Sequence, residues 1–538
     1  KPADAGDKWE DVYVVRREDG TLAPHTGELP ATLFVDEAVA APGLAGAPAG
    51  LRVCSALALL RDEAHRKSLD EYAALCGVPA AKIAELAERF TSHGKRAVAD
   101  AHGGTMSGAG FYTAYAIAML NTLVGNLNVE GGLVLDAGPF PPYGAGPRYN
   151  IAGFANRATP KGVGLSRNRF PYEKSSEFKR KQAAGQPVYP AAAPWYPATG
   201  GLSSEMLASA LAGYPYRAKV WFNHMSNPIY GIAGLKNVLL DKMKDPKVLP
   251  LSVSINPFIN ETNALADYIV PDTVTYESWG VSAPWADVVA KASTVRWPAV
   301  EPTVARTADG APVCLESFLI ACAKRLGMPG FGANAIADAD GNRYPLDTAE
   351  DFFLRGIANI AFGAGRPVPE ASDDDLELTG VARYRDVLQG KLKPEEWRRV
   401  AMVMSRGGRF DRMRDAWSDA GQTRQAWAKP LQVWSEELAG FRHAMTGERY
   451  SGCPTWYPAR LADGRDVRQQ YPRADWPFLL SSFKSNLMSS MSIGVDRLRQ
   501  VHPHNPVSIN RQDGERLGLR NGDRVRIGMR DDAGASLF

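Results

Sequence analysis

The sequence predicts an α/β fold, with a doubly wound parallel-sheet (Rossmann-like) body and a truncated β-barrel, of the double-psi type, at its carboxyl-terminal end. Two observations carry this prediction. Apolar strand-like segments alternate with helical segments between residues 218 and 270, which favours parallel strands joined by crossovers. From residue 476 onward, short strand-like runs are separated by Gly and Asn turns, which is typical of a small barrel.

Length and composition indicate an ordinary globular protein. The 538 residues are 45% hydrophobic and 22% charged, which leaves room for about three or four domains. A net charge of +3 is too small to indicate nucleic-acid or membrane-surface binding by the whole chain. The sequence contains no run of uncharged apolar residues long enough to span a membrane.

Both ends of the chain read as interior sequence. The first residues lack an initiator Met and the basic and apolar regions of a signal peptide, and the chain stops soon after a strand-like alternation begins. We therefore expect a piece of a longer protein, or a mature chain cut at both ends. The five cysteines are far apart and none is in a CxxC pair, so a zinc or iron–sulfur site inside this chain is not expected.

Helices dominate the first part of the chain. Residues 68–93 have helical apolar spacing interrupted by a Gly-Val-Pro turn, which predicts a helix pair. A short strand at 96–101, the glycine-rich loop 102–110 and a helix at 111–128 are expected next. Glycines before a helix suit close approach to a phosphate or pterin. The histidine that opens this loop, His102, taken by itself is more often a hydrogen-bonded structural residue than a ligand.

The stretch 138–201 has neither helical nor strand periodicity, and long irregular segments in compact proteins are often functional. Within it, residues 157–181 carry eight basic side chains against Glu173 and Glu177. This segment is either a solvated face or a positive approach for an anionic ligand. Its basic residues are Arg157, Lys161, Arg167, Arg169, Lys174, Lys179, Arg180 and Lys181.

The central region predicts strands at 218–222, 248–255 and 268–270, with helices at 235–244 and 261–266. Right-handed crossovers place the loops after the first two strands at one edge of the sheet, where ligands bind in doubly wound folds. Ser226 and Asn227 follow the first strand, and Asn256, Asn260, Glu261 and Thr262 follow the second. Helix capping alone also explains either loop, and the sequence contains neither GxGxxG nor a Walker A motif.

Residues 303–470 predict helices near 315–326 and 431–442, with the acidic stretch 370–378 on the surface. The expected barrel strands are "FLLSSF", "NPVSIN" and "DRVRIG". The sequence shows no GxSxG, HExxH or EF-hand motif, so hydrolase chemistry is not indicated.

Four segments together resemble one family. They are "FYTAYAIAMLNTLVGNLNVEGG", "KVWFNHMSNPIYG", "VSINPFINETNALADYIVPDTVTYESWG" and "HPHNPVSINRQDGERLGLRNGDRVRI". In this order and spacing they resemble the molybdopterin oxidoreductases of the dimethyl sulfoxide reductase type. The resemblance covers residues 96–300 and 476–538, and the combination is far more specific than any single segment.

Within that family, "HGGTMSGAGFYTAYAIAMLN" and "SSFKSNLMSSMS" resemble the tetrathionate-reducing type. The implied activity is a molybdenum-dependent, respiratory two-electron reduction of tetrathionate to thiosulfate. Arsenate, thiosulfate and polysulfide reductases are near relatives and remain alternatives. A non-catalytic scaffold that keeps this fold is the alternative from another class.

The resemblance implies a bis-molybdopterin guanine dinucleotide cofactor with one molybdenum, and a 4Fe-4S cluster. The metal ligand and the cluster cysteines are expected upstream of Lys1. It also implies a periplasmic location and a quinol-oxidising membrane anchor subunit together with an iron–sulfur electron-transfer subunit. The implied domain order is the end of an α/β domain (1–137), the basic loop region (138–215), a dinucleotide-binding domain (216–470) and a partial barrel (471–538).

Residue roles follow from the matching positions. Four polar residues would hold the guanosine diphosphate of one dinucleotide, namely Ser226, Asn227, Asn256 and Thr262. Many relatives have Asp where Asn256 stands, and Asp267 is expected to order the entry of a strand. The second pterin or the metal pocket would be lined by Lys484, Asn486, Ser489 and Ser490, and the pocket between domains by His102, Gly103 and Gly104. His102 and Lys484 are the catalytic-pocket candidates, and the basic segment would steer an anionic substrate.

Overall fold

The computed structural model describes residues 14–24, 31–39, 50–100, 110–134, 137–200, 202–232, 234–283, 288–424, 432–481, 485, 487 and 495–528. The chain forms two compact units. One contains residues 1–135, 170–199 and 417–478, and the other contains 136–169, 200–416 and 479–538. Because both units are discontinuous in sequence, the linear domain boundaries given above stay a prediction.

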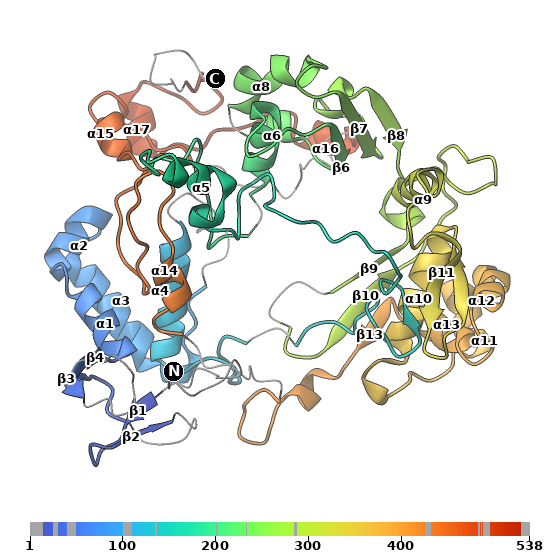
Figure 1. Ribbon diagram of the computed structural model, residues 1–538, viewed down its shortest axis with the longest axis horizontal. Helices are drawn as coiled ribbons and strands as arrows, with labels where there is room; N and C mark the ends of the chain where they lie inside the picture. Colours follow the sequence, from blue (N-terminus) through green and yellow to red (C-terminus); the bar gives the residue numbers. More distant parts are fainter. Residues whose placement is uncertain are drawn as a thin grey trace. The chain divides into compact units, whose positions relative to one another are not determined.

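The first unit is mainly helical. Its longer helices are α1 (Ala56–Ala64), α2 (Leu69–Cys76), α3 (Ala80–Ser92), α4 (Gly110–Leu123) and α5 (Ser176–Ala183), with short helices α14 (Glu436–Gly440) and α15 (Val467–Gln470) (Figure 1). Two hairpins pair β1 (Val14–Arg16) with β2 (Leu22–Pro24) and β3 (Asp36–Val39) with β4 (Leu51–Cys54).

The predicted helix pair is confirmed as α2 and α3. Ser68 caps α2 in a capping box with Glu71, because each residue's side chain bonds the other's backbone N–H. Gly77 ends the helix with φ +68°, a left-handed conformation that favours glycine.

The predicted strand at 96–101 is wrong for its described residues, 96–100, which are a 3-10 turn and irregular chain. Two buried amides take the place of a neighbouring strand. Asn121 accepts from the Ala99 N–H (3.0 Å) and donates to the Ala99 carbonyl (2.8 Å), and Asn126 donates to the Ala97 carbonyl. These contacts satisfy the backbone groups without a sheet.

The second unit contains the predicted parallel sheet. Its strands are β6 (Val220–His224), β7 (Leu251–Asn256) and β8 (Tyr268–Pro271), side by side in that order and all parallel. Three helices pack beside this sheet, namely α6 (Ser203–Ala212), α7 (Pro228–Gly231) and α8 (Leu235–Lys244) (Figure 1). Their apolar side chains form one cluster, against which Trp221 of β6 packs. The α/β prediction with a parallel sheet is therefore confirmed.

Two details of the sheet differ from expectation. The helix predicted at 261–266 is reduced to a single 3-10 turn, Asn263–Leu265, because the asparagine side chains around it bond the backbone locally. Val220, Phe222 and Tyr268 are exposed, so helices do not fully cover both faces of the sheet. The doubly wound arrangement stays a prediction.

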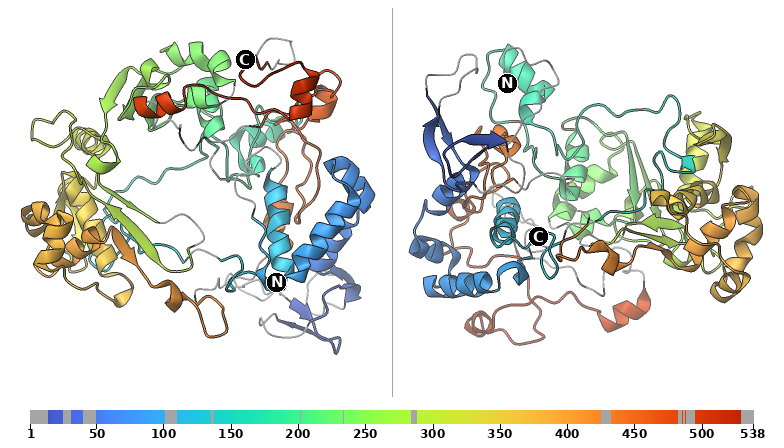
Figure 2. Two further views of the ribbon diagram at one scale, coloured as in Figure 1. Left: turned by 180° about the vertical axis from the view of Figure 1, so that it is seen from behind. Right: turned by 90° about the horizontal axis from the view of Figure 1, so that it is seen from below.

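Antiparallel sheets and helices form the larger core of the second unit. One sheet joins β12 (Arg343–Leu346), β11 (Gly332–Asp338) and β5 (Tyr149–Asn150), and another joins β13 (Gly408–Phe410), β10 (Ala292–Arg296) and β9 (Gly280–Ser282). The accompanying helices are α9 (Leu315–Arg325), α10 (Ala349–Ala361), α11 (Asp373–Thr379), α12 (Arg385–Lys391) and α13 (Trp397–Ser405). The last four pack together, yellow to orange in Figure 2.

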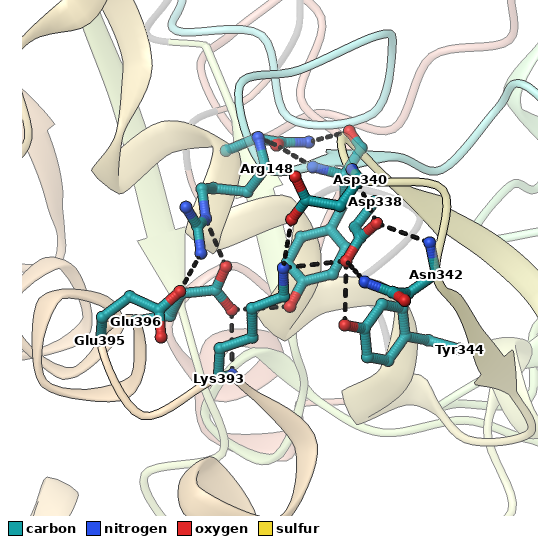
Figure 3. Close-up of polar contacts among 10 residues, drawn as sticks. Arg148, Asp338, Asp340, Asn342, Tyr344, Lys393, Glu395 and Glu396 are labelled. Carbon is teal, nitrogen blue, oxygen red and sulfur yellow. Dashed lines mark hydrogen bonds and ion pairs between the residues drawn. The ribbon is translucent and has the colours of Figure 1, made fainter.

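A buried polar network ties β5 to this core (Figure 3). Glu396 has no exposed side-chain surface and accepts from the Arg148 guanidinium and, at 2.6 Å, from the Tyr149 hydroxyl. Asp338 accepts from the Lys393 ammonium (2.8 Å) and the Tyr344 hydroxyl (3.0 Å). Because every charge in it has a close partner, the network stabilises the packing of β5, β11 and α13 rather than offering an open site.

The predicted barrel is not confirmed. Between residues 471 and 528 the described residues contain helices α16 (Asp496–Val501) and α17 (Arg511–Arg516) but no strand. Apolar residues of the expected strands are exposed there, namely Leu479, Leu480, Val507, Ile509, Val525 and Ile527. No helix in the described part of the chain is both long and apolar enough to cross a bilayer.

Candidate functional site

The candidate site is the carboxyl edge of the β6–β7–β8 sheet. His224 pairs with Ile255, and Asn256 pairs with Pro271, so the carboxyl ends of all three strands lie together. The loops that follow β6 and β7 therefore meet at this edge, as the sequence predicts. In parallel sheets this is where loops present polar groups to ligands.

Asn227 and Thr262 join the two loops directly. The Asn227 carboxamide oxygen accepts from the Thr262 N–H (3.1 Å) and from the Thr262 hydroxyl (2.6 Å). The Asn227 amide donates to the Glu261 carboxylate (2.7 Å), and the Thr262 hydroxyl accepts from the Ile229 N–H (3.0 Å). Thr262 is fully buried, so it holds Asn227 and the start of α7 in place.

A second set of amides supports the same edge. Asn223 donates to the Ser226 carbonyl (2.9 Å), and Asn260 donates to that carbonyl from the other loop (3.3 Å). Asn260 also accepts from the N–H groups of Thr262 and Asn263, which fixes the turn after β7. The capping-type bonds expected of these loops are therefore present, and their role in ligand binding stays a prediction.

Asn256 differs from its neighbours in keeping an open acceptor. Its amide donates to the Ser254 hydroxyl (3.1 Å), and its carboxamide oxygen has no hydrogen-bond partner in the part of the chain that the structure describes. The residue is 5% exposed. A nearly buried acceptor at a strand end is suited to an N–H or O–H donor of a ligand.

The residue after β6 is strained. Met225 has φ +50°, a left-handed conformation that is uncommon for a residue with a side chain. Its N–H reaches the Ile255 carbonyl at 3.4 Å. Such strain collects at functional sites because the surrounding structure must hold it in place.

The structure adds two residues that the sequence prediction did not assign. The His224 imidazole Nε2 lies 3.0 Å from the Asp272 carboxylate Oδ2, which joins the ends of β6 and β8. The sequence did contain an indication of this pair, because His224 ends β6 and Asp272 directly follows β8 in the same parallel sheet. Their pairing depends on the strand order, which the residues alone do not specify.

Asp267 has the predicted role. Its carboxylate accepts from the Ser252 N–H (2.7 Å), and its own N–H donates to the Ser252 hydroxyl (3.2 Å). These bonds align the entry of β8 with the start of β7.

The other predicted pocket residues lie outside the described residues, namely His102, Gly103, Gly104, Lys484, Asn486, Ser489 and Ser490. Their roles stay predictions. Among the residues that are described, no group of three or more His, Cys, Asp or Glu side chains is arranged to hold a metal ion.

The basic segment is only partly available to a ligand. Arg167 is buried, pairs with Glu205 (2.7 Å) and lies over the Tyr214 ring. Lys181 pairs with Glu177 at 2.8 Å. These two cations serve the fold, while six others are exposed, namely Arg157, Lys161, Arg169, Lys174, Lys179 and Arg180.

Comparison with curated proteins finds relatives that are similar in sequence over most of this chain. The tetrathionate reductase A subunit of Salmonella typhimurium is 51% identical over 524 residues, covering 96% of this chain and 50% of the relative. The tetrathionate reductase A subunit of Archaeoglobus fulgidus is 32% identical, covering 88% of this chain and 44% of the relative. The selenate reductase A subunit of Mesobacillus selenatarsenatis is 29% identical, covering 89% and 46%.

This chain belongs to the molybdopterin oxidoreductase family of the dimethyl sulfoxide reductase type. It spans about half the length of the curated relatives that it matches. No protein-family model matches it. Acetylene hydratase from Pelobacter acetylenicus is a structural neighbour at a TM-score of 0.32 and 17% identity, covering 60% of this chain and 35% of that one. That similarity is too low to support a fold assignment, which for this family member rests on its own strand order.

Proposed function

We propose that the full-length protein is a respiratory reductase that transfers two electrons to tetrathionate and releases two thiosulfates. The observation that carries the proposal is the 51% identity to a tetrathionate reductase over nearly all of this chain. Chains of selenate and thiosulfate reductases match it as well. Other oxyanions and polysulfide are therefore the competing substrates.

We propose further that the carboxyl edge of β6–β7–β8 holds the guanosine end of a molybdopterin guanine dinucleotide. The donor and acceptor set supports this fit. Guanine presents N–H donors, and the open Asn256 oxygen and the exposed Glu261 carboxylate are acceptors at the edge. Ser226 and Asn227 are half-buried on the facing loop, within reach of a ligand, whereas Thr262 acts through Asn227.

When bound, the molybdenum of this cofactor supplies the two electrons. The residues of this chain would anchor the nucleotide tail, and the exposed cations of residues 157–169 would attract the substrate, which is a dianion. The family resemblance adds a periplasmic location, a 4Fe-4S cluster, a quinol-oxidising membrane anchor and an iron–sulfur partner subunit. The names of the relatives, which designate them as subunits, are consistent with such a complex.

Apolar segments in the described part of residues 477–528 form no strand there, and they support a barrel in the full-length protein. Apolar residues are exposed in the described part of each expected strand, and they alternate in "NPVSIN" and "DRVRIG". Strands of a small barrel are stable only when paired on both sides. We propose that these segments pair with further strands in the complete protein.

The test uses the full-length protein with its natural cofactor. We expect stoichiometric molybdenum and guanine nucleotide, and dye-coupled reduction with the highest kcat/KM for tetrathionate among tetrathionate, thiosulfate, polysulfide, arsenate and selenate. A preference for another acceptor would reassign the substrate. A folded protein without molybdenum would instead favour the scaffold alternative.

A substitution tests the nucleotide edge separately. Asn227→Leu removes the three hydrogen bonds of the carboxamide and should lower molybdenum and guanine nucleotide content together. Lys242→Leu is the matched control, because it changes an exposed residue near the end of α8, where the helix returns to the opposite edge of the sheet. Full loading of Asn227→Leu would show that the edge does not bind the cofactor.

A further inference from the structure

The His224–Asp272 pair is an organised side-chain pair that the cofactor assignments leave unused. Asp272 is anchored without any help from His224. One of its carboxylate oxygens accepts from the Thr273 N–H (2.9 Å) and from the Leu315 N–H at the start of α9 (3.1 Å). Its side chain is 5% exposed, and the other oxygen lies 3.0 Å from His224 Nε2. The pair therefore orients His224 far more than it secures Asp272.

This arrangement determines what the histidine offers to a ligand. A carboxylate can only accept a hydrogen bond, so Nε2 carries the proton that it donates to Asp272. In the neutral imidazole, Nδ1 is then an acceptor. Nδ1 has no hydrogen-bond partner among the described residues, and 37% of the His224 side-chain surface is exposed.

His224 also lies next to the proposed nucleotide loop. It is the last residue of β6, immediately before the strained Met225 and two residues before Ser226 in the proposed nucleotide loop. Because β6 ends at His224, the imidazole and the loop that begins at Met225 lie at the same end of the sheet. An acceptor there would complement the Asn256 acceptor, and the two could receive donors from different parts of one nucleoside.

We propose that His224 is a further nucleotide-binding residue, whose Nδ1 accepts a hydrogen bond from a ribose hydroxyl of the guanosine, and that Asp272 is its positioning residue. This inference rests on the proposed function. It assigns the ribose rather than the phosphates to Nδ1, because the Nε2 proton is directed at Asp272 and phosphate oxygens offer no donor to an acceptor at Nδ1.

The decisive probe is the ribose itself. We would prepare the full-length protein in cells that make no molybdopterin and measure binding of GMP and of 2′,3′-dideoxy-GMP, which lacks both ribose hydroxyls. One net hydrogen bond corresponds to a preference of roughly 2- to 12-fold for GMP. His224→Phe keeps a planar ring but no acceptor, so it should remove the preference and leave dideoxy-GMP binding unchanged.

Two further variants separate positioning from contact. Asp272→Asn should reduce the preference while His224 is intact, because the amide no longer fixes the imidazole proton on Nε2. His224→Gln keeps an acceptor and should retain part of the preference. It also keeps the test decisive if the phenylalanine variant fails to fold. A purely structural role for the pair would lower stability in all three variants without changing the GMP to dideoxy-GMP ratio.

Each outcome has a separate meaning. Equal affinity of the unsubstituted protein for both nucleotides would overturn the ribose contact and leave the proposed function standing. If the free nucleotides do not bind, the molybdenum and guanine nucleotide content per molecule of the loaded protein decides. Unchanged loading in His224→Phe then overturns the inference, and loss of loading supports it. A loaded protein that contains molybdenum but no guanine nucleotide would overturn the proposed nucleotide edge, and with it this inference.

Discussion

Removing the Thr262 hydroxyl should loosen the loop that follows β6 without disturbing the core. Thr262→Val replaces the hydroxyl with a methyl group of similar size. The hydroxyl donates to the Asn227 carboxamide oxygen at 2.6 Å and accepts from the Ile229 N–H at 3.0 Å. Both Thr262 and Ile229 are fully buried, so water cannot replace the lost partners.

The magnitude follows from these two bonds. Each contributes about 0.5–1.5 kcal/mol, and a buried N–H left without a partner costs about 1–3 kcal/mol. The Asn227 oxygen keeps one bond, from the Thr262 N–H. We therefore expect the loop to lose about 1–3 kcal/mol of protection against local opening, which corresponds to roughly 5- to 150-fold faster amide exchange.

Hydrogen exchange measured by mass spectrometry checks this prediction. Peptides covering residues 226–232 should exchange faster in Thr262→Val, whereas peptides from α10 should not change. Thr262→Ser is the matched control, since it keeps the hydroxyl and loses only the methyl group. Equal exchange of the valine variant and the unsubstituted protein, or of the valine and serine variants, would refute the role given to the hydroxyl.

Three further predictions concern the charged residues. Glu396→Ala leaves the buried partners of that carboxylate without an acceptor and should lower the free energy of unfolding by about 3–5 kcal/mol, measured by thermal unfolding. Glu395→Ala is the control, because the Glu395 side chain is 56% exposed and its loss should cost about 1 kcal/mol or less. Burial raises the pKa of Asp338, but hydrogen bonds from Lys393 and Asn342 outweigh it and hold the pKa well below its usual value. Its contribution is thus complete above about pH 4 and is lost as the pH falls below that value, and Asp338→Asn should flatten the acid limb of an unfolding titration. Neutralising the exposed cations of residues 157–169 in the full-length enzyme should lower kcat/KM at low salt and have little effect at high salt, and salt-independent kinetics would remove them from substrate attraction.

The sequence was most informative where an element with a clear hydrophobic period contacts elements that are close to it along the chain. The parallel sheet was predictable because its strands and helix repeat within about fifty residues and each has the right period. The position of the loops that carry Asn227 and Thr262 at one edge followed from topology, since parallel strands end at one edge. The direct hydrogen bond between these two side chains was not predictable from it. Helix boundaries were equally local, as the capping box of Ser68 and Glu71 shows.

Other features depended on side chains that replace backbone partners. Asn121 and Asn126 satisfy the chain at residues 97–99, so a strand-like pattern formed no strand. The amides of Asn260 and Asn263 bond their own loop and shorten the expected helix to one turn. Polar residues of this kind compete with regular structure through short-range bonds, and a hydrophobic pattern does not record that competition.

The barrel segments illustrate the remaining limit in physical terms. Val507 and Ile509, like Val525 and Ile527, alternate as strand residues do, yet all four are exposed and unpaired with any strand in the described part of the chain. An alternating pattern states which face of a strand would be buried, but burial and hydrogen bonding both come from neighbouring strands. At the β6–β7–β8 edge the neighbours lie within this chain and the predicted geometry appeared. A strand prediction is therefore conditional on its partners, because an alternating pattern alone supplies neither the burial nor the hydrogen bonds of a sheet.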